Sequence, residues 1–172
     1  MDIDRDPTIT IEWKEGSFPQ IELTEKTTGL VLTSIEYFGA VADDARPLRD
    51  HVQIQWRADS KAFSVTVNDR FYSTSKIFAM NERSKFVEVD LPDYETMTGF
   101  PSPKADDLQP RGRAKVRGWN SDGHLIYYIL MTPIPSYTGE DPLEHTVLLN
   151  VTVEGMTPAK KMKKQNRVGG GF

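Results

Sequence analysis

Residues 111–132 read RGRAKVRGWNSDGHLIYYILMT, and this stretch decides the fold because it has the pattern of a β-hairpin. The tetrapeptide NSDG at 120–123 supplies turn residues between two runs with strand character. The second run, 125–131, is apolar at every position, which predicts a central strand buried on both faces. The hairpin therefore predicts a fold built from antiparallel sheet.

Alternation of apolar and polar residues recurs along most of the remaining chain. Within 63–68, Phe63, Val65 and Val67 alternate with serine, threonine and asparagine, which is typical of a strand with one buried face. Similar runs predict further strands over 9–13, 21–23, 30–38, 52–57, 76–81, 86–91 and 146–153. Helical patterns are short and are limited to 40–50 and 92–99. We expect an all-β fold, an antiparallel β-sandwich or barrel of about ten short strands with at most one or two short helices.

Charge divides the chain into two parts. The 172 residues suit one domain, and the net charge is −4. Residues 157–172 carry five basic residues and no acid, which leaves 16 basic and 25 acidic residues in 1–156, a net charge of −9. We therefore expect a single acidic β-rich domain over 1–156 and a basic, glycine-ended C-terminal arm over 157–172.

The first strand of the hairpin carries a row of cations. In an extended strand, side chains two residues apart share a face, so we expect one face to present Arg111, Arg113, Lys115, Arg117 and Trp119. Such a row suits a polyanion, because phosphates would meet the basic groups and a base could stack on the indole. It also suits salt bridges to acidic residues of the same chain or of another subunit, and the acidic body favours this second interpretation.

The arm is the second candidate contact region. Its basic residues are Lys160, Lys161, Lys163, Lys164 and Arg167. Opposite charge on the body predicts that the arm contacts another copy of the chain, an acidic protein or, as the alternative, nucleic acid.

Little in the sequence indicates catalysis. Zero cysteines exclude disulfides, thiolate metal sites and cysteine nucleophiles. His51, His124 and His145 each stand at the start of a predicted strand with no second ligand at metal spacing, so we expect hydrogen-bonded boundary residues. The chain has neither a GxSxG elbow nor a glycine-rich phosphate loop. We therefore expect no enzyme, no metal and no cofactor.

Two segments without periodicity, 99–110 and 133–144, read as long loops, which often carry interactions. Together with the charge division, they predict a non-catalytic structural subunit that associates with its own copies or an acidic partner through these loops and the arm. A component of a viral or phage particle fits this profile. The alternative is a nucleic-acid-binding β-barrel that uses 111–119 and the arm. The acidic N-terminus lacks a secretory pattern, so we expect a cytoplasmic protein, or one assembled into a particle there, without a membrane span.

Overall fold

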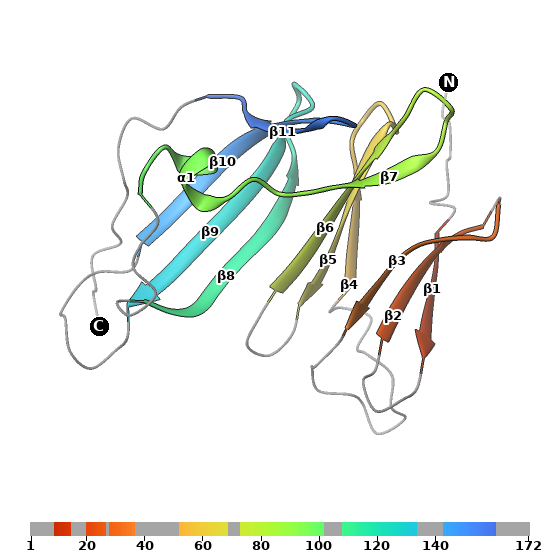
Figure 1. Ribbon diagram of the computed structural model, residues 1–172, viewed down its shortest axis with the longest axis horizontal. Coiled ribbons are helices and arrows are strands. Elements are labelled where there is room, and N and C mark those ends of the chain that lie inside the picture. The colour runs from red at the N-terminus through yellow and green to blue at the C-terminus, as the bar shows by residue number, and fades with distance from the viewer. Residues whose placement is uncertain are drawn as a thin grey trace.

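The computed structural model describes seven parts of the chain, and they form three antiparallel sheets and one short helix (Figure 1). The described residues are 9–14, 20–26, 28–36, 52–68, 73–101, 108–133 and 143–160. The N-terminal sheet consists of β1 (Ile9–Lys14), β2 (Gln20–Glu25) and β3 (Leu30–Glu36). The central sheet consists of β4 (Val52–Trp56), β5 (Ala62–Asn68), β6 (Ser73–Met80) and β7 (Phe86–Val89). The C-terminal sheet, in the order β11-β10-β9-β8, consists of β8 (Leu108–Trp119), β9 (Leu125–Pro133), β10 (Leu143–Thr152) and β11 (Gly155–Pro158).

The expected all-β class is confirmed, with three open sheets in place of a closed barrel. The short helix predicted within 92–99 is α1 (Tyr94–Thr98), while the second helical candidate, 40–50, lies outside the described residues. Both predicted loops are shorter than expected, because β8 begins at Leu108 and β10 at Leu143. No helix in the described ranges has the length and apolar content needed to cross a bilayer.

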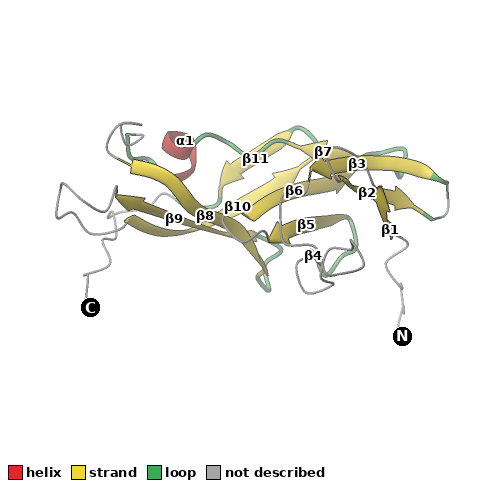
Figure 2. Cartoon of the chain, turned by 90° about the horizontal axis from the view of Figure 1, so that it is seen from below, coloured by secondary structure: helices red, strands yellow, loops and turns green. Residues whose placement is uncertain are grey.

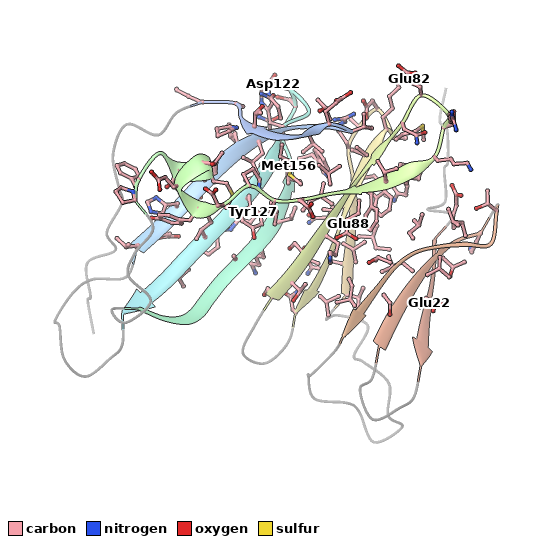
Figure 3. The ribbon with its side chains drawn as sticks, viewed as in Figure 1. Glu22, Glu82, Glu88, Asp122, Tyr127 and Met156 are labelled. Carbon is pink, nitrogen blue, oxygen red and sulfur yellow. The ribbon has the colours of Figure 1, made fainter. Side chains whose placement is uncertain are left out.

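Both faces of the central sheet are buried, one against each neighbouring sheet (Figures 1 and 2). On the first face, the rings of Phe63 and Phe78 stack with centroids 4.8 Å apart and pack against Leu23 and Ile35 of the N-terminal sheet. Glu88 also lies on this side and accepts a hydrogen bond from Thr33 (Figure 3). The N-terminal sheet is therefore attached mainly by an aromatic and aliphatic cluster.

The second face packs against the C-terminal sheet and α1. Ile77 and Ala79 join a larger cluster that includes Met97 of α1 and, from the C-terminal sheet, Tyr127 and Met156 (Figure 3). Burial raises the pKa of the Tyr127 phenol to about 12. The central sheet is thus the middle layer of a three-layer stack.

The serine and threonine of β5 lie on this second buried face, which the alternation of 63–68 did not predict. Ser64 and Thr66 are only 1% and 2% exposed. The Thr66 hydroxyl lies 2.9 Å from the Ser75 hydroxyl, which accepts a hydrogen bond from the Val116 N–H of β8 at 3.2 Å. Hydroxyl groups therefore help to dock β8 onto the central sheet. The sequence pattern had predicted that this face of β5 would be exposed to solvent.

Helix α1 closes the end of the second cluster. The Asp93 side chain caps it by accepting a hydrogen bond from the Thr96 N–H, and this bond lowers the pKa of the Asp93 carboxyl. The helix ends at Gly99, whose positive φ of 75° suits glycine. Tyr94 and Met97 are buried beneath it, so this short helix covers apolar residues of the C-terminal sheet.

Replacing Phe63 tests the attachment of the N-terminal sheet. We expect Phe63→Ala to lower the free energy of unfolding by about 3–5 kcal/mol, because the side chain is fully buried among aromatic rings. Val31→Ala is the control, since Val31 is 48% exposed and should change stability by about 0.5 kcal/mol or less. Urea denaturation measures both, with Phe63→Leu as a milder variant. Equal losses for Phe63→Ala and Val31→Ala would contradict this packing.

Candidate assembly surface on the C-terminal sheet

A β-bulge in β8 reverses the faces of the strand near its end. Val116 pairs with Tyr127 and Gly118 pairs with Ile126. Arg117 is therefore an extra residue that pairs with no residue of β9. Gly118 has a φ of 141°, a conformation that side chains rarely adopt. After the bulge, Trp119 pairs with Leu125 and packs on the inner face against the core. The expectation that Trp119 shares a face with the cations is therefore wrong.

Lys115, before the bulge, and Arg117, the bulged residue, lie on the outer face. Lys115 is half-buried and pairs with Tyr128, whereas Arg117 is exposed and holds its guanidinium 3.8 Å from the centroid of the Tyr128 ring. This distance is that of a cation–π contact. The backbones of Arg111 and Arg113 belong to β8, but their side chains lie outside the described residues.

The arm is described only at its beginning. Lys160 is exposed, and it follows Ala159, whose N–H donates to the Leu148 carbonyl at 2.7 Å. The C-terminal sheet therefore extends through Pro158, past the expected domain boundary at residue 156. The remaining predicted contact residues of the arm lie outside the described residues: Lys161, Lys163, Lys164 and Arg167.

The outer face of the C-terminal sheet has an apolar centre. Ile126 and Leu130 of β9 and Leu148 of β10 point outward and are half-buried. Thr146 and Asn150 on the same face are exposed, so no described strand or helix covers it. On the outer face the expected burial of 125–131 is confirmed at Tyr128, which is buried, and is wrong at Ile126 and Leu130, which keep part of their surface in solvent.

Charged groups border this apolar centre on both sides and one lies over its middle. Lys115 lies on β8, and Glu144 lies on β10, where it pairs with Leu130. The Arg117 guanidinium lies over Tyr128, between Ile126 and Leu130. Lys115 and Glu144 have no ion-pair partner among the described residues. The salt bridges expected for the cationic row are thus not formed by Lys115 within the described part of one chain.

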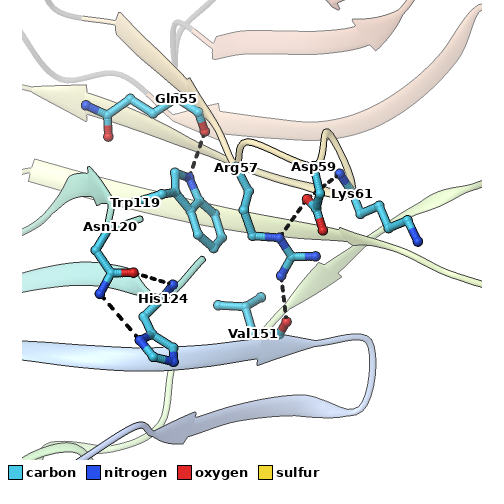
Figure 4. A network of polar contacts seen from close by, with 8 residues as sticks. All are labelled: Gln55, Arg57, Asp59, Lys61, Trp119, Asn120, His124 and Val151. Carbon is cyan, nitrogen blue, oxygen red and sulfur yellow. Dashed lines mark hydrogen bonds and ion pairs between the residues drawn. The ribbon is translucent and has the colours of Figure 1, made fainter. Parts of the chain in front are cut away.

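Trp119 and Arg57 join the inner face to the central sheet (Figure 4). The Trp119 indole N–H donates to the Gln55 carbonyl at 3.1 Å, and the Arg57 guanidinium lies 5.6 Å from the indole centroid. Arg57 also donates to the Val151 carbonyl at 3.1 Å and pairs with Asp59 at 2.8 Å. Arg57 therefore connects the turn after β4 to β8 and β10. Trp119 has a structural role in this connection, because it contacts both Gln55 and Arg57.

The described histidines are hydrogen-bonded, as expected. His124 Nδ1 lies 3.4 Å from the side-chain amide of Asn120 in the turn before β9. His145 is fully buried in β10, with Nε2 at 2.8 Å from the Tyr94 hydroxyl and its ring stacked on Phe100. Its Nδ1 has no hydrogen-bond partner among the described residues, and burial lowers the pKa of the imidazole. His51 lies outside the described residues.

Neither the described side chains nor comparisons with other proteins identify a known activity. Within the described part of the chain, no three His, Asp or Glu residues are grouped so that they could hold a metal ion. Comparison of the chain with protein-family models, curated proteins and solved structures gave no match. The strongest candidate site is the outer face of the C-terminal sheet, because apolar and charged side chains lie together there and no described strand or helix covers them.

The structural role of Trp119 can be tested against a matched tryptophan. We expect Trp119→Phe to lower the free energy of unfolding by about 1–2 kcal/mol, because the Gln55 carbonyl loses its indole donor. Trp56→Phe is the control, since the buried Trp56 indole N–H donates to no group in the described part of the chain. Urea denaturation compares the two. A larger loss for Trp56→Phe would contradict the inter-sheet role of Trp119.

Acid is expected to weaken the packing of α1 through His145. A histidine whose pKa is lowered by folding stabilises the fold fully above its ordinary pKa of 6.5 and loses that contribution as the pH falls below it. We compare unfolding free energies between about pH 8 and about pH 5 for the wild type, His145→Phe and the control Val31→Ala, an exposed position without a titrating side chain. The acid-dependent loss should be smaller in His145→Phe and unchanged in Val31→Ala. The same pH profile in all three proteins would contradict the prediction.

Proposed function

We propose that this chain is a non-catalytic structural subunit that associates with copies of itself through the outer face of the C-terminal sheet. The observation that carries the proposal is the row of Ile126, Leu130 and Leu148, which no described strand or helix covers, between a cationic edge strand and Glu144. Contiguous apolar surface rimmed by charge is typical of protein interfaces. A subunit of a particle assembled in the cytoplasm, such as a viral or phage particle, is consistent with this arrangement.

The basic arm supplies a second contact in the proposed assembly. It leaves the C-terminal sheet after β11, at the sheet whose outer face carries the candidate surface. Residues 1–156 have a net charge of −9, so the five cations of the arm are attracted to the body of a neighbouring copy. Electrostatic attraction of this kind weakens as salt is added.

Light scattering coupled to size-exclusion chromatography tests the proposal on the full chain. We expect a defined oligomer that weakens when Lys161, Lys163, Lys164 and Arg167 are all replaced by Gln. The matched control replaces four exposed cations of the body by Gln: Lys26, Lys61, Arg83 and Lys85. It removes the same charge and should leave the oligomer intact. A monomer for the wild type at every concentration would overturn the proposal.

Nucleic-acid binding is the second candidate, favoured by the exposed Arg117 beside Lys115 on β8. In that case the purified chain would carry nuclease-sensitive material, and its affinity would fall steeply with salt. Arg113→Glu combined with Arg117→Glu would abolish the binding. The inward position of Trp119 removes one expected stacking platform for a base, and the net charge of −4 also disfavours this function.

A further inference from the structure

We infer that the outer face of the C-terminal sheet packs against the same face of a second copy about a two-fold axis parallel to β9. This inference rests on the proposed function and specifies the geometry of the interface. An isologous interface requires each residue on one side of the axis to suit the residue at the mirrored position in the partner. The pairing register of β8, β9 and β10 supplies that test.

Three rows of residues cross the outer face from β8 through β9 to β10. The first row is Gly118, Ile126 and Leu148, and the second row is Lys115, Tyr128 and Thr146. In the third row, the backbone of Arg113 pairs with Leu130, which pairs on its other side with Glu144. Each row therefore runs from a β8 residue to a β10 residue with an apolar or aromatic residue between them.

An axis along β9 brings β8 of one copy over β10 of the other. Each row then lies over the same row of the partner, with its β8 end opposite the partner's β10 end. Leu148 of one copy then faces Gly118 of the other, so a large side chain meets a position without one. Glu144 likewise faces the β8 position of Arg113, with Lys115 at the next position of the same face. The outward residues of β9 meet their own counterparts and join two apolar centres.

An axis across the strands gives the opposite result. It places β8 over β8, so Lys115 meets the cations of the same strand in the partner, and it places Glu144 opposite the apolar Leu148 position. Like-charge contacts of this kind oppose association. Charge and shape therefore both select the axis parallel to β9.

The face is large enough for a weak dimer. With the axis along β9 the strands that overlap in the two copies are β8, β9 and β10. Three strands spaced by about 4.8 Å and the nine residues of β9 at about 3.4 Å each give roughly 440 Å² of flat area. A stable interface buries about 800 Å² per partner, so the sheet contact is that of a weak, concentration-dependent dimer. Sheets packed face to face lie about 10 Å apart, a separation that the half-buried Ile126 and Leu148 can fill.

Arg117 is the one described residue that opposes this packing. Its guanidinium lies over Tyr128, next to the axis, and there it approaches the Arg117 of the partner. We therefore expect Arg117→Gln to tighten the dimer about threefold to tenfold, because a like-charge contact is removed. Leu148→Asp should weaken it about tenfold to hundredfold, because a charge replaces the side chain that faces Gly118. Analytical ultracentrifugation measures both.

Cysteine cross-linking tests the direction of the axis, and the chain offers a clean background because it has no cysteine. Full-length copies with Lys115→Cys are mixed with copies that carry Thr146→Cys and treated with a short thiol-specific cross-linker. We expect the mixed pair to react about tenfold faster than either variant alone, since the two positions face each other. Glu82→Cys, exposed in the turn between β6 and β7, is the control and should not cross-link.

Each alternative outcome has a definite meaning. Faster reaction of Lys115→Cys or Thr146→Cys with itself overturns the axis, and a dimer without cross-linking at either position overturns the interface. A wild-type monomer in light scattering overturns the proposed function as well. If Arg117→Gln no longer carries nuclease-sensitive material and its dimer is no tighter than that of the wild type, the surface binds a polyanion instead of a second copy. Circular dichroism confirms that the variants fold, as expected for positions at the sheet surface.

Discussion

Burial of both faces of β5 and β6 is the constraint on which the rest of the structure depends. Phe63 and Phe78 require an apolar cover on one side, and Ile77 and Ala79 require one on the other. A four-stranded sheet cannot cover its own two faces, so two further sheets must pack against it. The N-terminal and C-terminal sheets are those covers, and each uses only its inner face for the purpose.

The two covers are attached by different chemistry. The N-terminal sheet packs on aromatic rings, whereas β8 also docks through the hydroxyl groups of Thr66 and Ser75 and the indole N–H of Trp119. Hydrogen bonds fix direction more strictly than apolar contact does. They hold β8 in one orientation on the central sheet, and that orientation directs Lys115 and the apolar row of β9 away from the core.

Much of the fold was predictable because local chemistry and overall fold agree. The NSDG turn and the apolar run after it lie in the β8–β9 hairpin as predicted, and Asp93 and Gly99 cap the one short helix in the described residues. Alternation was misleading for β5, because a serine or threonine on a strand looks the same whether it faces water or a hydrogen-bonding partner. The strand β8, which is distant in sequence, docks on the hydrogen-bonded pair of Thr66 and Ser75, while the Ser64 hydroxyl is buried without a hydrogen-bond partner among the described residues.

The candidate site was predictable in composition and not in geometry. The cations of 111–117 were apparent, but a bulge adds one residue without a strong sequence signal, and it sends Trp119 to the opposite face. Gly118 was the available clue, since an isolated glycine in a strand often marks a bulge. The strand β11 was missed because its four residues follow a tight turn and have little alternation. The inner partner of His145 was hidden because Tyr94 lies 51 residues away.

Hydroxyl-radical footprinting at low and high protein concentration tests the central claim most directly. It reports the solvent exposure of individual side chains in the unmodified full chain. Self-association through the outer face predicts that Ile126, Leu130 and Leu148 lose reactivity as concentration rises, while Leu30 and Val31, each 48% exposed, keep theirs. Protection of Leu30 and Val31 instead, or no protection at any concentration, would contradict the claim.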